Sequence, residues 1–369
     1  MTGILCTDID AGGGVESVSK MLDTQLNKSG IKSKIYSLKS AKSYKNAVGF
    51  NISTEKLSAR DIKKITEKIK NDSVDNLILQ LNSPYCPLAN INLYRKLCHE
   101  RTALYSVYHN SPKSFISRYK YFDDPLPLFF IKWLKTRIIF SPHGKKFIQQ
   151  SARYSRVITI SEGCRNEIKK YYGVNSVFIP NCFNISISDA SVFKNKQHTM
   201  AFLGRIDYES KNFKLLLNSW MQVKDKKDWK LEIFGHGDKT LINNYILKKK
   251  ITNIDVKDSL TTDKVLKFLE ANSVIVLTSY HEGFPTILAE ASARGNAIIT
   301  THYDGFSDEI AKNGKNGFVT NFSSEEIAEK MQNLINNNEL LREQQANSLE
   351  IIKEYVKNYN AIKKWREVL

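Results

Sequence analysis

The sequence predicts an α/β protein built from two doubly wound parallel sheets. Short apolar runs rich in β-branched residues alternate with amphipathic helical stretches along the chain, the order that builds parallel strands covered by helices. At 369 residues the chain is long for one core, because domains hold roughly 100 to 200 residues. Two domains are therefore expected, residues 1–185 and 186–349, with a break near 184–198 where polar residues interrupt the pattern.

Strands are expected where a short apolar run is bounded by polar or turn residues. In the first half these runs are residues 3–7, 32–37, 76–81, 103–108, 157–160 and 177–179. In the second half they are residues 200–203, 230–234, 255–257, 274–277, 297–300 and 317–320. A last helix, residues 350–369, follows the final strand and forms a third segment of the expected domain plan.

The composition is that of an ordinary soluble globular protein, with 41% hydrophobic and 25% charged residues. No stretch approaches the roughly 18 consecutive apolar residues of a membrane span, and the first residues lack the basic region and cleavage site of a signal peptide. The five cysteines are scattered without a C-x-x-C spacing, which predicts neither a disulfide framework nor a zinc site. A cytoplasmic location is therefore expected.

The net charge of +17 is concentrated in the first half of the chain. Residues 1–185 hold 29 Lys and Arg against 14 Asp and Glu, a net of +15, whereas residues 186–369 hold 26 against 24, a net of +2. Residues 126–140 interleave large apolar side chains with cations, which fits either a membrane surface or a domain core with a solvated basic face. A nucleic-acid partner is not supported, because no helix-turn-helix, RNP-like or zinc-finger pattern accompanies the charge.

Two carboxylates mark the strongest candidate site. Glu282 and Glu290 lie eight residues apart, on either side of the junction between the strand expected at 274–277 and a helix expected to begin at Pro285. The N–H groups of the first helical turn, between the two carboxylates, favour an anion such as a diphosphate. A nucleotide sugar has hydroxyls at both ends and a diphosphate in the middle, so it matches this arrangement.

Further phosphate-binding candidates follow the first strand of each half. In the second half these are Arg205 and Lys211, because Arg can hold phosphate oxygens bidentately and Lys supplies a compact charge. In the first half a run of three glycines includes Gly13 and Gly14, and such a turn lets backbone N–H groups approach a phosphate. The run lacks the G-x-G-x-x-G spacing, which disfavours NAD.

The glutamate pair, with Gly-Phe-Pro inside it, resembles the signature of retaining glycosyltransferases of the GT-B fold, family 4. The resemblance implies that Glu282 addresses hydroxyls of the transferred sugar and that Glu290 binds the ribose of the nucleotide. Arg205 and Lys211 are similar to the pair that binds the donor diphosphate and stabilises its departure. The Tyr-His-Asn segment around His109 is similar to one that lines the family's sugar pocket. The catalytic residues expected on this basis are Arg205, Lys211, Glu282 and His109.

The resemblance also implies a set of donor-binding residues in the glycine-rich loop and in the glutamate motif. They are Gly13, Gly14, Gly283, Phe284, Pro285, Thr286 and Glu290. The implied fold is GT-B, in which an acceptor-binding domain, 1–185, and a donor-binding domain, 186–349, face a cleft. The C-terminal helix, 350–369, is implied to cross back to the first domain.

The implied reaction needs no protein general base, because a phosphate oxygen of the donor takes the acceptor proton, and it needs no essential metal or other cofactor. A UDP-sugar is the expected donor. The basic first domain suggests an anionic or lipid-linked glycan acceptor, such as a bacterial lipopolysaccharide core or another surface polysaccharide precursor, at the cytoplasmic face of the inner membrane.

Two other functions are open at this point. A sugar-nucleotide epimerase of the same two-domain shape would bind the donor but transfer nothing, although the spacing of the Arg-Lys and Glu pairs favours a transferase. A non-catalytic basic module would bind a polyanion or a membrane through residues 101–170, in a salt-sensitive manner and with no response to nucleotide sugars.

Overall fold

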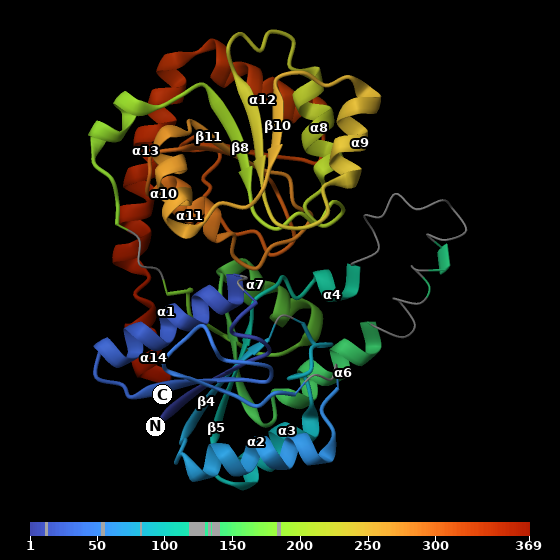
Figure 1. The fold of residues 1–369 in the computed structure, drawn as a ribbon, viewed down its shortest axis with the longest axis vertical. Helices are drawn as coiled ribbons and strands as arrows, with labels where there is room; N and C mark the ends of the chain where they lie inside the picture. The colour runs from blue at the N-terminus through green and yellow to red at the C-terminus, as the bar shows by residue number, and fades with distance from the viewer. Residues whose placement is uncertain are drawn as a thin grey trace. The chain divides into compact units, whose positions relative to one another are not determined.

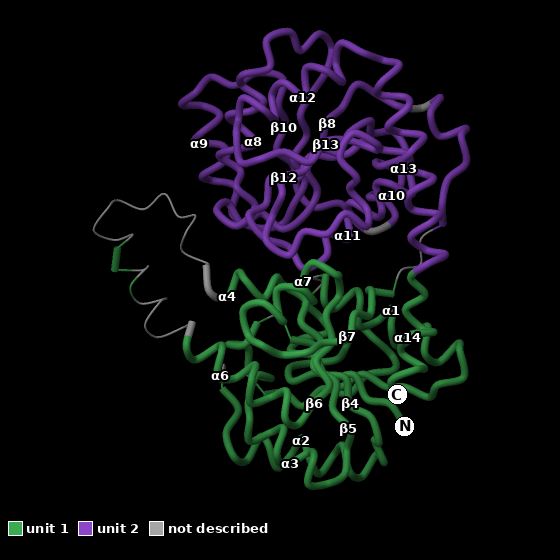
Figure 2. Tube along the Cα trace, turned by 180° about the vertical axis from the view of Figure 1, so that it is seen from behind, with its two compact units in different colours: residues 1–184, 359–369 green, residues 185–358 purple. Residues whose placement is uncertain are grey.

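The computed structural model describes residues 1–11, 14–52, 56–81, 83–117, 130–131, 134, 141–182 and 186–369. The chain forms two compact units, coloured separately in Figure 2. Unit 1 comprises Met1–Asn184 together with Tyr359–Leu369, and unit 2 comprises Ile185–Asn358. Each unit is an α/β domain with its own parallel sheet, so the predicted fold class is confirmed.

The sheet of unit 1 has the strand order β3-β2-β1-β4-β5-β6-β7, with every neighbouring pair parallel. Its strands are β1 (Thr2–Cys6), β2 (Ser33–Ser37), β3 (Ala47–Gly49), β4 (Asn76–Leu81), β5 (Ala103–Tyr108), β6 (Ser155–Thr159) and β7 (Val177–Phe178). Strand β3 was not predicted from the sequence, because a three-residue strand at the sheet edge carries too short an apolar run to be recognised.

The helices of unit 1 lie on both faces of this sheet, with α2 and α3 on one face and α1 and α14 on the other (Figure 1). Their bounds are α1 (Gly14–Lys28), α2 (Ala59–Asn71), α3 (Ile91–His99), α4 (Ser114–Ser117), α6 (Ser141–Ser151), α7 (Glu162–Glu167), the π-helix η2 (Ile168–Tyr172) and α14 (Ala361–Val368). Local sequence sets where α2 begins, because Ser58 and Asp61 form a capping box.

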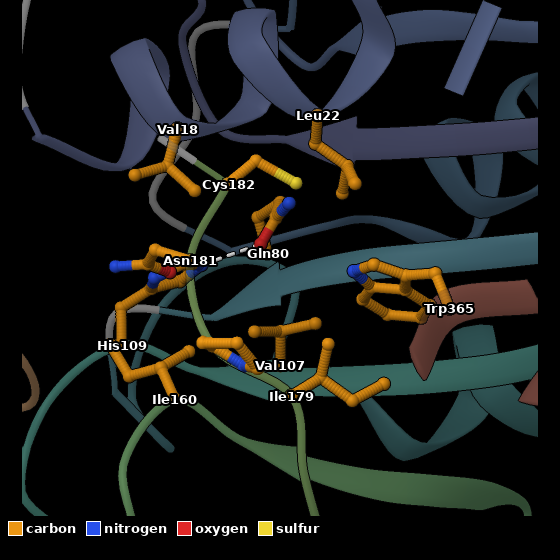
Figure 3. Close-up of a pocket in the computed structure, with 11 residues that line it drawn as sticks. Val18, Leu22, Gln80, Val107, His109, Ile160, Ile179, Asn181, Cys182 and Trp365 are labelled. Carbon is orange, nitrogen blue, oxygen red and sulfur yellow. Dashed lines mark hydrogen bonds between the residues drawn. The ribbon is translucent and has the colours of Figure 1, made fainter. Parts of the chain in front are cut away.

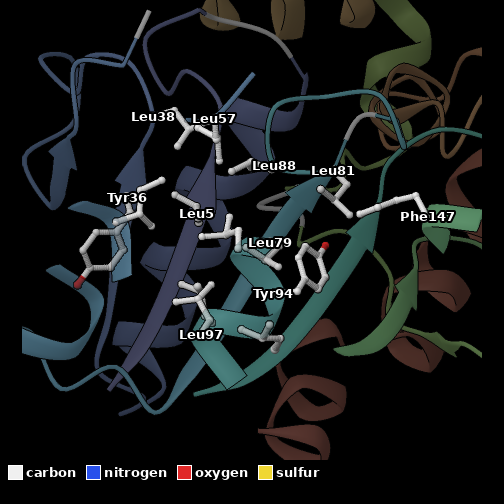
Figure 4. Packing of buried hydrophobic residues seen from close by; sticks show 14 of the residues in the cluster. Leu5, Tyr36, Leu38, Leu57, Leu79, Leu81, Leu88, Tyr94, Leu97 and Phe147 are labelled. Atoms are coloured by element: carbon white, nitrogen blue, oxygen red, sulfur yellow. The ribbon is translucent and has the colours of Figure 1, made fainter. Parts of the chain in front are cut away.

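The core of unit 1 fills the space between the sheet and the helices α2, α3 and α6, as Figure 4 shows. Leu5 and Leu79, from neighbouring strands, are fully buried, as are Tyr94 and Leu97 of α3. The Tyr94 ring meets Phe147 of α6 edge-on, with centroids 5.8 Å apart. Strands buried on both faces read as continuous apolar runs, which is why the sequence located them.

The sheet of unit 2 has the strand order β10-β9-β8-β11-β12-β13, again with every pair parallel. Its strands are β8 (Thr199–Leu203), β9 (Lys230–Phe234), β10 (Ile254–Lys257), β11 (Val274–Leu277), β12 (Ala297–Thr301) and β13 (Gly317–Thr320). Each strand expected in this half is present, with bounds that differ by one residue at most.

The helices of unit 2 form two groups on opposite faces of the sheet, with α8, α9 and α12 on one face and α10, α11 and α13 on the other (Figure 1). Their bounds are η3 (Ala190–Asn195), α8 (Phe213–Gln222), α9 (Thr240–Lys249), α10 (Thr262–Ala271), α11 (Thr286–Ser292), α12 (Ser324–Asn336) and α13 (Asn338–Asn358).

The end of the chain is two helices rather than the single helix expected from residue 350. Helix α13 ends at Asn358 within unit 2, and Asn360 caps a new helix, α14, which belongs to unit 1. The Tyr105 hydroxyl donates a 2.6 Å hydrogen bond to the Val368 carbonyl, and Trp365 is 3% exposed. The last eleven residues are thus an integral part of the first unit's core.

All five cysteines are free. None of the helices formed by the described residues is long and apolar enough to cross a membrane. Of the segment 126–140 the structure describes Phe130, Ile131 and Leu134, whose side chains are 59%, 62% and 41% exposed. The remainder of that segment lies outside the described residues.

Candidate functional site

The strongest candidate site lies at the carboxyl ends of β8 and β11, which are neighbours in the sheet of unit 2. The strand order reverses between these two strands, because β9 and β10 extend the sheet on one side and β12 and β13 on the other. In open parallel sheets, ligands bind in the crevice that this reversal creates. Arg205 and Lys211 follow β8, and Glu282 follows β11, so the topology brings the predicted cations and the first glutamate to one place.

Lys211 and Glu282 are in direct contact. The Lys211 Nζ lies 2.6 Å from Glu282 Oε1, and the two side chains are only 18% and 14% exposed. The Ser279 hydroxyl donates a second hydrogen bond to the same oxygen, at 2.7 Å. Partial burial strengthens a charge pair, because fewer water molecules screen it. This ammonium and this carboxylate therefore hold each other in a defined position.

Hydrogen bonds to backbone carbonyls join the two loops that carry this pair. The Thr278 hydroxyl donates to the Lys211 carbonyl at 3.0 Å, and the Tyr280 N–H donates to the Ser210 carbonyl at 3.1 Å. Farther along, the Glu282 N–H donates to the Asp304 carbonyl at 3.0 Å. The site is therefore built on three loops that fix one another.

Arg205 lies on the loop after β8 with its side chain largely in solvent. Its Nη2 is 3.5 Å from Asp207 Oδ2, and the Arg205 side chain is 64% exposed. Burial acts to raise the pKa of Asp207, but hydrogen bonds from Ser210 outweigh it and hold the pKa below its usual range. Asp207 is therefore ionised. Its contact with the Arg205 guanidinium is long, so the guanidinium is available to bind an anionic ligand.

Helix α11, which carries Glu290, begins one residue later than the sequence predicts. Pro285 occupies the N-cap position, with φ −76° and ψ 93°, and the helix begins at Thr286. The extended ψ angle of Pro285 places this residue outside the helix. Gly283, two residues earlier, is buried. The Phe284 ring is 9% exposed and stacks on Tyr355 of α13, with centroids 5.7 Å apart. The Phe284 side chain therefore packs in the core, and only its backbone is available to a ligand.

Glu290 lies on α11 and is half-buried. Desolvation raises the pKa of its carboxyl group to about 7, although Arg294, one turn later, acts in the opposite direction. The group is therefore close to half-protonated at neutral pH, in a position to donate as well as accept a hydrogen bond.

His109 lies in unit 1, directly after β5. Its Nε2 is 2.5 Å from Oε1 of Gln80, a buried residue of β4, and burial lowers the pKa of the imidazole to about 4. His109 also lines a cavity of about 10 Å³, together with Asn181 and Trp365 (Figure 3). That volume holds about one water molecule, so no sugar enters this cavity. The catalytic role assigned to His109 stays a prediction.

Gly14 opens α1 at the carboxyl end of β1, beside the point where the strand order of unit 1 reverses between β1 and β4. Gly13, the other glycine predicted to bind the donor, lies outside the described residues. Within the part of the chain that the structure describes, no three His, Cys, Asp or Glu side chains form a group that could hold a metal ion.

Several residues of these sites were not predicted. Gln80, Ser279 and Asp304 contact or position the predicted residues through the bonds given above. Gln80 could have been noticed as the single polar residue inside the apolar run of β4. Ser279 and Asp304 carry no such signal, because their roles arise only when separate loops meet.

Residues 184–350 match the family model of the group 1 glycosyl transferases. The chain is 24% identical over 378 residues to the amylovoran biosynthesis glycosyltransferase AmsD of Erwinia amylovora, covering 99% of this chain and 98% of that protein. It is also 24% identical over 304 residues to the poly(ribitol-phosphate) alpha-N-acetylglucosaminyltransferase of Staphylococcus aureus, covering 81% of this chain and 56% of that protein.

Among solved structures, Anabaena HepE in complex with UDP-glucose is similar with a TM-score of 0.76 at 14% identity, covering 100% of this chain and 99% of that one. The lipopolysaccharide outer core galactosyltransferase WaaB is similar with a TM-score of 0.68 at 18% identity, covering 99% of both chains. These likenesses show the GT-B fold. The match of residues 184–350 and the likeness to AmsD over nearly the whole chain show that the chain is an enzyme of the glycosyltransferase class.

Proposed function

We propose that this glycosyltransferase moves a sugar from a UDP-sugar to a glycan acceptor, with retention of configuration at the anomeric carbon, in the synthesis of a bacterial lipopolysaccharide or another surface polysaccharide. The observation that carries the proposal is the contact between Lys211 and Glu282 at the strand-order reversal of unit 2. In this proposal the Lys211 ammonium serves the donor phosphates and the Glu282 carboxylate serves the sugar hydroxyls.

In this proposal the donor lies across the carboxyl ends of β8 and β11. Arg205 and Lys211 neutralise the charge that grows on the diphosphate as the glycosidic bond breaks, which is the type of electrostatic stabilisation that usually dominates catalysis. Both side-chain hydrogen bonds to Glu282 end on Oε1, and we assign Oε2 to a hydroxyl of the transferred sugar. Glu290 binds the ribose. The UDP named in the HepE structure supports UDP as the nucleotide.

The reaction is a displacement at the anomeric carbon. The bond from this carbon to the phosphate oxygen breaks, and UDP leaves with the electron pair. The acceptor oxygen forms its bond on the same face, and its proton passes to a phosphate oxygen of the donor. No protein base takes part, and we expect no divalent cation to be required, so donor hydrolysis should be unchanged in EDTA.

The acceptor in this proposal is an anionic or lipid-linked glycan. The net charge of +15 in residues 1–185 supports it, because a basic surface raises the local concentration of an acidic substrate. Two of the relatives are named for amylovoran and for poly(ribitol-phosphate), both polymers. The exposed Phe130, Ile131 and Leu134 support peripheral contact with the cytoplasmic face of the inner membrane.

The test is slow hydrolysis of a panel of UDP-, GDP- and ADP-sugars without acceptor. Wild type is compared with Glu290→Ala and with Glu343→Ala, an exposed carboxylate on α13 that serves as the control. Release of UDP from one donor, lost in Glu290→Ala and kept in Glu343→Ala, is the expected result. Release of a different nucleotide would replace UDP in the proposal.

The same panel separates the other two functions. Protection of the protein by a UDP-sugar against thermal unfolding, without release of UDP even when glycan acceptors are supplied, would favour an epimerase. No release and no protection, with salt-sensitive binding to polyanions, would overturn the donor site and favour a basic binding module.

A further inference from the structure

A second pocket of about 560 Å³ lies in unit 2 at the carboxyl ends of β12 and β13. This volume is within the range of roughly 300 to 1,000 Å³ that small-molecule sites occupy. Its polar lining includes His302 after β12, Asn321 after β13, and Asp308, Lys312 and Lys315 of the intervening loop. None of these residues belongs to the donor site proposed above.

The wall of this pocket is rigid. Asn316 is fully buried; its Oδ1 accepts from the Lys312 N–H at 2.9 Å and its Nδ2 donates to the Ile310 carbonyl at 2.8 Å. At Gly317, φ is +155° and a Cβ atom would lie 1.8 Å from the Ile298 carbonyl oxygen, so no other residue fits there. These contacts tie the loop that carries both lysines to the buried part of unit 2.

The lining combines an aromatic face with positive charge. The rings of His302 and Phe306 lie 4.7 Å apart, tilted by 35°. Lys312 and Lys315 are among the lining residues, together with one carboxylate, that of Asp308. The C–H face of a pyranose packs well on a ring, and an ammonium group attracts a carboxylate or a phosphate. The amides of Asn313 and Asn321 add hydrogen-bonding groups for hydroxyls.

We propose that this pocket is a second binding site, specific for an anionic sugar unit, whose carboxylate or phosphate is held by Lys312 and Lys315 while its ring lies on His302 and Phe306. The choice of a glycan as the ligand rests on the proposed function, whereas the pocket and its charge do not. The site selects acidic glycans over neutral ones.

The pocket is connected to the donor loop through Asp304, which lies between the two ring residues in the sequence. The Asp304 N–H donates to the Tyr280 carbonyl at 2.9 Å, and its own carbonyl accepts from the Glu282 N–H at 3.0 Å. A ligand seated on His302 and Phe306 would therefore lie beside Asp304, whose carbonyl holds the Glu282 N–H.

The test follows the imidazole signals of protein labelled with ¹⁵N-histidine, in which His302→Gln identifies one of the seven histidines. The titrants are glucuronate, glucose 6-phosphate, glucose and inorganic phosphate. A saturable shift of the His302 signal with both acidic sugars, at least about tenfold weaker with glucose and with phosphate, is the expected result. The shift should be lost in Lys312→Ala/Lys315→Ala and kept in Lys248→Ala/Lys249→Ala, which removes two exposed lysines of α9.

Three results would overturn the proposal. They are no saturable shift, equal binding of glucose, or equal binding of phosphate alone, the last of which would leave only an anion site. Unchanged signals from the other histidines show that each variant is folded. Donor hydrolysis measured on the same samples separates the two proposals, because hydrolysis without a His302 shift removes the second site and leaves the proposed function in place.

Discussion

The Nζ of Lys211 lies 2.6 Å from Oε1 of Glu282, although 71 residues separate them in the sequence. Each residue follows a different strand, and the two strands are neighbours only because the sheet places β11 beside β8. A half-buried pair of this kind contributes to the stability of unit 2 only while it is complete, because removal of one partner leaves the other charge without its counterion.

Replacement of Lys211 by Met should reduce donor hydrolysis by at least about 100-fold, because a preorganised cation is removed from the leaving diphosphate. Stability should fall as well, since Glu282 would lose the ammonium that compensates its burial. Hydrolysis kinetics and urea unfolding measure the two effects. Lys248→Met on α9 is the control, and equal kinetics for both variants would exclude Lys211 from catalysis.

The stability of the protein should depend on pH through Glu290. Its folded-state pKa of about 7 lies above the ordinary 4.5, so the folded protein binds the proton more tightly than the unfolded chain. The stability that this proton contributes is complete below about pH 4.5 and is lost as pH rises through about 7. Glu290→Gln should therefore raise the unfolding free energy at pH 8, by up to about 3 kcal/mol, and leave it nearly unchanged at pH 4.5.

Urea unfolding of wild type and Glu290→Gln at several pH values measures this pH-dependent difference in unfolding free energy. Glu343→Gln, on the exposed surface of α13, should show no pH-dependent difference. A stabilisation by Glu290→Gln that is equal at pH 4.5 and pH 8 would contradict the titration.

His109 should remain neutral down to about pH 4, because burial lowers its pKa to about that value. Gln80→Glu would place a carboxylate 2.5 Å from the ring in place of the amide, and the imidazole should then titrate at a higher pH. The ¹⁵N shifts of His109 follow both titrations. If the pKa of His109 in Gln80→Glu stays at the wild-type value, the contact between the two side chains does not form in solution.

Lys196 should contribute to the stability of unit 2. Its Nζ donates to the carbonyls of Leu269, Asn272 and Arg294, at 2.9, 2.7 and 2.7 Å, and burial lowers its pKa to about 7. These carbonyls lie at the ends of α10 and α11, where a helix leaves carbonyl groups without an intrahelical partner. Lys196→Met should cost about 2 to 4 kcal/mol of unfolding free energy, because buried acceptors lose their donor.

The exposed Lys194, two residues earlier, gives the matched control, Lys194→Met, for which no more than about 0.5 kcal/mol is expected. Chemical unfolding of both variants measures the two losses of unfolding free energy. Similar losses in the two would show that the Lys196 contacts contribute little.

Apart from β3, the strands of both sheets could be predicted because buried parallel strands are continuous apolar runs, so a local signal suffices. The residues at their carboxyl ends, Arg205, Lys211 and Glu282, could be predicted for a related reason, since a polar group that directly follows such a run must lie at one edge of the sheet. The beginning of α11 was predicted one residue early, because Pro285 is compatible with both the N-cap and the first helical position.

The sequence by itself determined the two parallel sheets, all their strands except β3, and the residues at the carboxyl ends of those strands, because the pattern of apolar residues and their order along the chain can be read locally. Only the tertiary structure decided which of those residues meet. It paired Lys211 with Glu282, set Gln80 against His109, turned Phe284 into the core and formed the pocket beside His302. The pKa values of Glu290 and His109 likewise follow from burial, which arises only when distant segments of the chain pack together.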